Sequence, residues 1–331
     1  MKTILITGAA GFVGYHLSQR CLKAGYRVVG VDDMSQGMTT NLDDCRKQKN
    51  FYFLKADLTK MSAIRRIGKL LSELEIKKIE SIIHLAAKKI PRYGGRNNTI
   101  LANFNTTVVA CGIGSKFRAK IIFASTSDVY GLTPEKPFKE TGNAVFGPSF
   151  VGRWSYGASK YLSEQLLWGY NEEFDLPVII LRIFGVYGPR QVKGWKGNAV
   201  SAFIEQAENG VKMDLHGDGK QTRSFVYIDD LIEAILLAVK LKTAENRIIN
   251  IGSTEIISME KLADKISQLV NGDKKIDYNY VSYNSFTGKV YQDIIAKLPS
   301  LEIAKKYLSW EPKTDLDKGL KKTVNWYLTS G

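Results

Sequence analysis

Short apolar runs alternate with longer segments of helical periodicity over the first half of the chain. Strands are predicted at 3–7, 27–32, 51–57, 81–86, 120–125 and 177–183. Helices are predicted around 12–24, 60–72, 97–115 and 153–173. Because the runs are apolar throughout and do not alternate, we expect a parallel sheet with helices on both of its faces.

The pattern changes after residue 184, where glycine, lysine and aromatic residues become more frequent. The segment "SFVYIDDLIEAILLAVK" predicts a short strand that leads into a helix, and "RIINIGS" predicts another strand. The last quarter reads as helices and loops and ends in "DLDKGLKKTVNWYL". Repeats, low-complexity tracts and flexible linkers are missing from the sequence, so we expect a second lobe that is interwoven with the first.

Composition narrows the class of protein. With 331 residues, 44% of them hydrophobic, the chain has room for two domains or for one large domain with a lobe attached. Cys21, Cys45 and Cys111 form no Cys-x-x-Cys pair, so neither disulfides nor a metal site is predicted, in keeping with a cytoplasmic location. The opening residues superficially resemble a signal peptide, yet their glycines have a fixed spacing and no cleavage site follows. No apolar run reaches the length of a membrane span, so no membrane partner is expected.

The net charge of +14 raises the question of nucleic-acid binding. The basic residues are scattered, and no basic run is interleaved with aromatic residues. We therefore predict no nucleic-acid partner, although a dinucleotide-binding protein without activity that holds nucleic acid stays a remote alternative. An anionic small substrate would use only a few of these charges.

A glycine motif follows the first strand in "TGAAGFVGYHL", with Gly8, Gly11 and Gly14. Such glycines allow a tight turn and direct the N-terminus of the next helix at a pyrophosphate. The second strand ends in Asp32, 24 residues beyond Gly8, where a carboxylate accepts hydrogen bonds from ribose hydroxyls and repels a 2′-phosphate. The pattern predicts NAD as the cofactor, with a cofactor-free glycine turn as the alternative.

Further cofactor contacts are predicted around the same edge of the sheet. Asp57, at the end of the third strand, could face the adenine ring. The other predicted contacts are Phe12, Val13, Leu58 and Ala86.

Polar residues also follow the fifth strand, in "FASTSDVYG", where ligands bind in open parallel sheets. Tyr156 and Lys160 are four residues apart in a predicted helix, so both side chains leave the same face. A free phenol has a pKa of about 10, too high for a base at neutral pH. A nearby ammonium and an oxidised nicotinamide ring would both favour the phenolate. The alternative is an ordinary amphipathic helix with a tyrosine at its edge.

Together, "GAAGFVG", "HLAA", "STSDVYG", "YGASK" and "GDGKQTRSFVYIDD" resemble the extended short-chain dehydrogenases that act on nucleotide sugars, over essentially the whole chain. The resemblance implies an α/β fold, a doubly wound parallel (Rossmann) sheet with a smaller interwoven α/β substrate-binding lobe. We expect the NAD domain to span 1–183 with about 223–252, and the lobe to span about 184–222 with 253–331. The resemblance also implies a nucleotide-diphosphate sugar as the substrate and a role in polysaccharide biosynthesis. It further implies a homodimer formed through the helices at 97–115 and 153–173.

The resemblance assigns roles to single residues. Tyr156 would be the acid/base, Lys160 would hold the nicotinamide ribose and lower the tyrosine pKa, and Thr126 would bond the sugar C4 hydroxyl. Ser127 and Asp128 would face the same sugar.

Other matching positions lie outside this group. Asn103 matches a helical asparagine of the family, and Lys89 or its neighbour Lys88 could approach a cofactor phosphate. Arg223 resembles the arginine that clamps the diphosphate, and Asn198 an asparagine near it. A second diphosphate arginine is missing, since "VYQD" (290–293) replaces Arg-x-Gly-Asp; Lys297 or Arg190 could substitute.

Three reactions share an initial oxidation at C4. Epimerisation needs only Thr126, Tyr156 and Lys160, whereas a 4,6-dehydratase usually has Asp-Glu where this chain has Ser127 and Asp128. A hexuronate decarboxylase usually has Ser-Glu there and a later "RKPS"-like segment, and this chain has "AKLPS" at 296–300. We therefore predict a 4-epimerase of a UDP-hexose or UDP-hexuronate, with decarboxylation as the nearer alternative.

Overall fold

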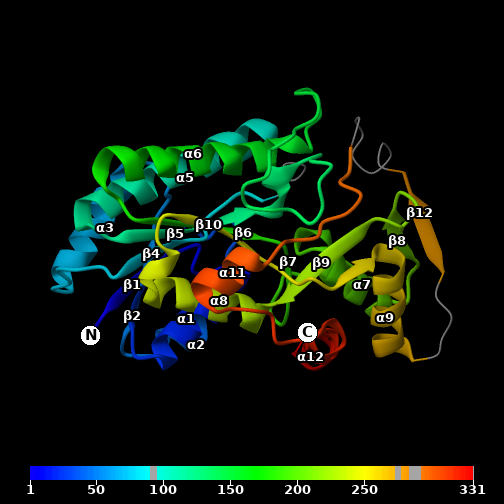
Figure 1. Ribbon diagram of the computed structural model, residues 1–331. Coiled ribbons are helices and arrows are strands. Elements are labelled where there is room, and N and C mark those ends of the chain that lie inside the picture. Colours follow the sequence, from blue (N-terminus) through cyan, green and yellow to red (C-terminus); the bar gives the residue numbers. More distant parts are fainter. Residues whose placement is uncertain (90–94, 273–276, 283–291, 331) are drawn as a thin grey trace. The chain divides into compact units, whose positions relative to one another are not determined.

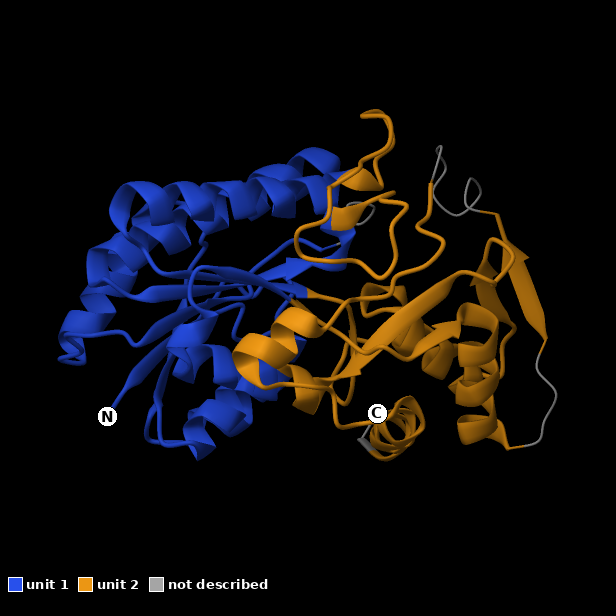
Figure 2. Cartoon of the chain, viewed as in Figure 1, with its two compact units in different colours: residues 1–129, 155–182, 232–249 blue, residues 130–154, 183–231, 250–331 orange. Residues whose placement is uncertain are grey.

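The computed structural model describes residues 1–89, 95–272, 277–282 and 292–330, and it divides into two compact units (Figure 2). Unit 1 contains residues 1–129, 155–182 and 232–249. Unit 2 contains residues 130–154, 183–231 and 250–331. Because each unit is built from three separate segments, the two units are interwoven in sequence.

The sheet of unit 1 has seven strands among the described residues. Their order is β10 (Arg247–Ile251), β6 (Val178–Ile183), β5 (Lys120–Thr126), β4 (Ser81–His84), β1 (Thr3–Thr7), β2 (Arg27–Asp32) and β3 (Phe51–Lys55). The pairs of β1 with β2 and with β4 are parallel, as are β2 with β3 and β4 with β5. The strand order reverses at β1, which has β2 on one side and β4 on the other. Ligands are expected outside the carboxyl ends of the strands at such a reversal. The predicted doubly wound parallel sheet is confirmed.

Helices cover both faces of this sheet (Figure 1). One face carries α1 (Phe12–Lys23), α2 (Thr40–Arg46) and α8 (Ile228–Lys240), and the other carries α3 (Ser62–Glu73), α5 (Arg96–Phe117) and α6 (Trp154–Phe174). The core under the second face joins strand residues to Ile67 of α3, Val109 of α5 and Leu167 of α6. Double coverage explains the unbroken apolar runs, because strands buried on both faces need no alternation.

Unit 2 is built from shorter elements. A three-stranded sheet has the order β11 (Ile256–Ser258), β9 (Thr222–Tyr227) and β7 (Gly185–Tyr187), and β12 (Tyr278–Val281) pairs in parallel with β8 (Met213–His216). Its helices are α7 (Ala199–Glu208), α9 (Met259–Asn271), α11 (Glu302–Leu308) and α12 (Leu316–Ser330).

The division into units differs from the predicted domains in two segments and at the boundary residues 183 and 250–252. Residues 130–154 and 223–231 belong to unit 2, although the sequence pattern placed them with the cofactor domain. The first segment lacks an apolar run, and its Phe138 pairs with the backbone of Leu298 and Ser300 within unit 2. Tertiary pairing of this kind leaves no local sequence signal.

One buried histidine in the sheet of unit 1 makes stability depend on pH. His84 ends β4 with its side chain fully enclosed, and its Nδ1 lies 2.7 Å from Oγ1 of Thr7. Burial, and secondarily the charge of Lys160, lower the pKa of His84 to about 3. Between about pH 6.5 and about pH 3 an unfolded chain carries a proton on this imidazole. In the folded protein the imidazole stays neutral over the same range.

We expect this histidine to weaken the protein in acid. Below about pH 6.5 the unfolded chain binds a proton at His84 that the folded chain excludes, so the free energy of unfolding falls by about 1.4 kcal/mol per pH unit. Urea unfolding between about pH 6.5 and about pH 4 should show a shallower pH dependence for His84→Asn than for the parent protein. Equal slopes for the two proteins would contradict the prediction.

Candidate active site

The turn between β1 and α1 brings main-chain N–H groups to the carboxyl edge of the sheet in unit 1. Gly8 has a φ of +72°, and a Cβ there would lie 2.9 Å from the backbone nitrogen of Ala86. A Cβ at Gly14 would lie 2.1 Å from the carbonyl oxygen of Gly8. Gly11 gives the helix no side-chain cap, so the N–H groups of the first helical turn remain available to an anion.

Asp32 ties this turn to the end of β2. Its Oδ2 accepts a hydrogen bond from the N–H of Ala10 at 3.0 Å, and its Oδ1 accepts one from the N–H of Met34 at 2.8 Å. Burial raises the pKa of Asp32, while these two hydrogen bonds oppose the change. The carboxylate therefore shapes the glycine turn, and its remaining lone pairs are what a ribose hydroxyl could use.

Asn103 of α5 fixes the segment that follows β4. Its Oδ1 accepts the N–H of Lys88 at 2.7 Å, and its Nδ2 donates to the Lys88 carbonyl at 3.2 Å and to Oγ of Ser159 at 2.9 Å. The amide thus joins the β4 loop to α6. The Lys88 ammonium reaches Oγ of Ser35 in the loop after β2, which leaves it beside the expected ribose site.

Thr126, Tyr156 and Lys160 meet where β5 ends against α6. Thr126 and the Tyr156 phenol share a side-chain hydrogen bond. The Lys160 ammonium donates to the carbonyl of Ala124 at 2.8 Å and lies 4.3 Å from the centre of the Phe123 ring. The structure thus brings the three predicted catalytic residues together at the carboxyl end of one strand.

The Tyr156 phenol differs from the expectation in one respect. Burial, and then the charge of Asp128, raise the pKa of Tyr156, although the bond with Thr126 opposes this change. Lys160 was expected to lower that pKa, but its ammonium is directed to a carbonyl and burial lowers its own pKa to about 7. The chain alone therefore leaves the phenol protonated, and the positive nicotinamide ring is the remaining charge expected to activate it.

Asp128 acts electrostatically on both the Tyr156 phenol and Lys89. Asp128, whose N–H donates to Oγ1 of Thr126 at 3.2 Å, follows β5 in a short 3-10 helix (Ser127–Tyr130). The surrounding protein lowers the pKa of Lys89, and Asp128 opposes that shift. Ser127 is buried, so its hydroxyl is less accessible to a sugar than the sequence suggested.

A buried ion pair close to Lys160 was not anticipated from the sequence. Glu164, one turn after Lys160 in α6, accepts a hydrogen bond from Nη2 of Arg182 at 2.7 Å. The carboxylate also accepts from Oγ of Ser125 in β5. Two features of the sequence could have predicted this pair: a glutamate on an apolar helix, and an arginine inside the strand run "VIILRI". Buried charges occur in pairs, so each of these residues implies a partner of opposite charge.

Unit 2 contains a cationic cluster around Asp293. Nη2 of Arg223 donates to Oδ2 of Asp293 at 2.8 Å, and Nη1 donates to the carbonyls of Thr222 and Ile294. Burial alone would raise the pKa of Asp293, yet the charges of Arg223, Arg153 and Lys297 lower it below its usual value. Three cations around one carboxylate leave an excess positive charge that suits a diphosphate. Val290 and Tyr291 of "VYQD" lie outside the described residues.

Asn198 has a structural role in unit 2. Its Oδ1 accepts the N–H groups of Val200 and Ser201 and thereby caps α7, while its Nδ2 donates to the carbonyl of Val186 at 2.7 Å. A substrate contact through this side chain stays a prediction.

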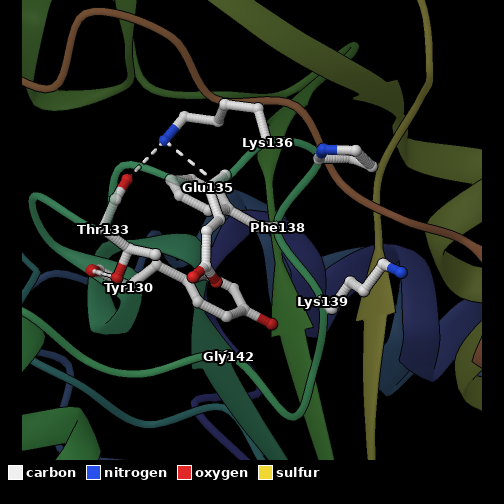
Figure 3. Close-up of a pocket in the computed structure, with 8 residues that line it drawn as sticks. Tyr130, Thr133, Glu135, Lys136, Phe138, Lys139 and Gly142 are labelled. Carbon is white, nitrogen blue, oxygen red and sulfur yellow. Dashed lines mark hydrogen bonds between the residues drawn. The ribbon is translucent and has the colours of Figure 1, made fainter.

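A separate hollow of about 280 Å³ in unit 2 has none of the predicted site residues in its wall (Figure 3). One of its two lysines, Lys136, donates to the carbonyl of Thr133 at 2.6 Å and lies 3.9 Å from the centre of the Phe138 ring. Since these contacts hold the loop together, we assign the hollow no chemistry.

The geometry agrees with a comparison of the whole chain with known families. The model of the NAD dependent epimerase/dehydratase family matches residues 4–252. The chain belongs to this family. Membership confirms the resemblance drawn from the sequence and NAD as the cofactor.

Three similar proteins are informative. UDP-N-acetyl-alpha-D-glucosaminuronate decarboxylase of Bacillus cytotoxicus is 32% identical over 98% of both chains. UDP-glucuronic acid decarboxylase 1 of Xenopus tropicalis is 30% identical over 98% of this chain and 72% of its own length. The crystal structure of UDP-glucuronic acid 4-epimerase from Bacillus cereus, with UDP-glucuronic acid and NAD, is 29% identical over 98% of both chains, with a TM-score of 0.83.

The residues of unit 1 fit the cofactor of an NAD-dependent family member. The glycine turn, the uncapped first helical turn that begins with Phe12 and Val13, and Asp32 provide the required donors and acceptor.

Two predicted contacts have other roles. Oδ1 of Asp57 accepts from the N–H and the hydroxyl of Thr59, which lowers the Asp57 pKa. The side chain of Leu58 lies in the core of unit 1, so only its backbone could touch a ligand.

Two features are missing from the part of the chain that the structure describes. No cluster of three or more metal-ligating side chains lies among residues 1–89, 95–272, 277–282 and 292–330. No helix within these described ranges combines the length and apolar character required to cross a bilayer.

We expect Asp32→Ala to weaken NAD binding by roughly 10- to 100-fold and to reduce the preference for NAD over NADP, because a charged acceptor is lost. Dissociation constants for both nucleotides measure the effect, and Asp32→Asn tests the charge with less disturbance of the turn. Asp43→Ala is the control, since the exposed Asp43 carboxylate pairs with Arg46 within α2 and does not contact the glycine turn. An unchanged nucleotide preference in both Asp32 variants would remove the assigned role.

Tyr156→Phe should reduce turnover by about 10²–10⁴-fold without unfolding the protein or abolishing NAD binding, because an acid/base group is removed. Tyr170→Phe, a half-buried phenol on the same helix, serves as the matched control and should retain the parent rate. Turnover can be followed by nuclear magnetic resonance of the sugar product. A near-normal rate for Tyr156→Phe would exclude this phenol as the acid/base.

Proposed function

We propose that the chain oxidises C4 of a UDP-hexuronate and then releases its C6 carboxylate as carbon dioxide. The observation that carries the proposal is the carboxylate of Asp128, which acts on the Tyr156 phenol beside Thr126. Epimerisation at C4 needs no such fourth group. The names of two relatives at 32% and 30% identity support the same reaction.

The first step uses the residues that all members of the family would share. Thr126 would hold the C4 hydroxyl, and Tyr156 would take its proton as C4 becomes a ketone. NAD, when bound, accepts the hydride from C4 and contributes the positive charge that favours the phenolate. Lys160 would orient the nicotinamide ribose through the same ammonium that now bonds Ala124.

The second step follows from the chemistry of the 4-keto sugar. The carboxylate on C5 is then β to the C4 ketone, so the electrons of the C5–C6 bond can move into the carbonyl as carbon dioxide leaves. The resulting enolate must gain a proton at C5. Asp128 is our candidate for the acid that provides it, after taking a proton from solvent, and its negative charge would also disfavour retention of the sugar carboxylate.

Epimerisation of a UDP-hexuronate at C4 is the second candidate. It was the prediction from the sequence, and it needs only Thr126, Tyr156 and Lys160. The similarity to the Bacillus cereus UDP-glucuronic acid 4-epimerase favours it. Both candidates use the same substrate class, and a UDP-hexose would suit only the epimerase.

We expect UDP-glucuronate or its N-acetylamino counterpart, labelled with carbon-13 at C6, to give labelled carbon dioxide and one solvent deuteron at C5 in heavy water. Asp128→Asn should reduce carbon dioxide release by about 10²–10⁴-fold while C4 oxidation, followed by NADH absorbance, continues. Asp175→Asn, which removes an exposed carboxylate just after α6, is the control and should keep the parent rate. A C4 epimer that retains all six sugar carbons, without carbon dioxide, would establish the epimerase instead.

The homodimer also remains a proposal. Leu101 of α5 and Leu162 of α6 are exposed apolar residues on the two helices expected to form the interface.

A further inference from the structure

The buried ion pair behind Lys160 is almost completely removed from water. The side chains of Glu164 and Arg182 are 2% and 5% exposed. Arg182 donates from Nη2 to Oε2 at 2.7 Å, and its Nε lies 3.2 Å from Oε1 and 3.3 Å from Oε2. A pair held by several hydrogen bonds in this way fixes α6 on β6, because separating it would leave a buried charge without compensation.

The same carboxylate also holds the end of β5. Oγ of Ser125 donates to Oε1 of Glu164. On one side of Ser125 is Ala124, whose carbonyl accepts the Lys160 ammonium, and on the other side is Thr126, which bonds Tyr156. Three successive residues of β5 therefore contact three residues of α6, and the middle contact is the buried carboxylate.

We propose that Glu164 is a positioning residue for the acid/base pair, acting through Ser125 and Arg182 to fix the end of β5 against the turn of α6 that carries Tyr156 and Lys160. The effect of Glu164 on turnover rests on the proposed C4 oxidation, whereas its effects on structure and on the Lys160 ammonium do not. The contacts that carry the proposal lie entirely within unit 1.

Charge is the second way in which Glu164 acts on Lys160. The groups that interact electrostatically with the ammonium are Glu164 on its own helix and His84 in β4. Tyr156 lies one turn earlier in α6, and Arg182 of β6 is bonded to Glu164. Burial lowers the pKa of Lys160 to about 7, and Glu164 opposes that shift. His84 is neutral because its pKa is lowered to about 3, and Arg182 is paired with Glu164. Loss of the carboxylate would therefore make Lys160 release its proton at lower pH.

The decisive measurement needs no substrate. In protein labelled with carbon-13 at the lysine ε-carbon, Lys160→Met identifies the Lys160 signal, and its titration is compared between the parent and Glu164→Gln. We expect the midpoint to fall by about one pH unit, a tenfold loss of proton affinity, in the variant. An unchanged midpoint would overturn the proposal. The result is independent of whether the enzyme decarboxylates or epimerises its sugar.

Kinetics supply a second test. Ser125→Ala leaves the ion pair of Glu164 and Arg182 intact, so it can be measured even if Glu164→Gln fails to fold. We expect kcat of Ser125→Ala to fall about tenfold. The alkaline side of the kcat profile of Glu164→Gln should move to lower pH. Glu245→Gln, which breaks the Lys120–Glu245 pair at the opposite end of β5, is the control and should leave the profile unchanged. Parent kinetics in Ser125→Ala would overturn the proposal, whereas absence of any turnover in the parent would refute only the proposed function.

Discussion

The structure of unit 1 depends on how it accommodates a cation that is almost entirely removed from water. The side chain of Lys160 is among the largest fully buried side chains of the chain, and an ammonium in such a place must be compensated by oxygen atoms or by an aromatic face. The Ala124 carbonyl and the Phe123 ring supply this compensation from β5. Because both groups belong to one strand, these two contacts favour one position of α6 against β5. The same position brings Thr126 to Tyr156, so the requirement of a buried charge also assembles the site.

At the cofactor end of unit 1, the groups that stabilise the turn between β1 and α1 are also the groups expected to bind the cofactor. Asp32 holds the backbone of Ala10 and of Met34, and the turn that it stabilises is the one whose N–H groups we expect to face a phosphate. Gly8 and Gly14 are required by close backbone approaches, so they would be needed for the turn even without a ligand. A glycine motif therefore reports a turn geometry first. It reports a dinucleotide only when an acid at the end of the next strand accompanies it.

The sequence predicted the sheet well because burial on both faces leaves continuous apolar runs, as in β1 and β6. It grouped Tyr156, Lys160 and Thr126, which lie together in the structure, because a helical spacing and a strand end are local features; their catalytic roles stay predictions. The pair of Glu164 and Arg182 was missed since its partners are distant in sequence, and β8, β11 and β12 are too short to show a period. In the chain without cofactor the pKa of Tyr156 is raised, first by burial, and the direction of the Lys160 ammonium toward Ala124 could not be read from spacing.

The missing second arginine in unit 2 illustrates how charge can be retained while geometry changes. Arg223 uses three of its five N–H groups on Asp293 and two carbonyls, so two remain for a ligand oxygen. Lys297 adds a point charge to the same cluster but cannot form two parallel hydrogen bonds as a guanidinium does. Arg153 provides the third charge. We therefore expect all three charges to attract a diphosphate, and its orientation to depend mainly on Arg223.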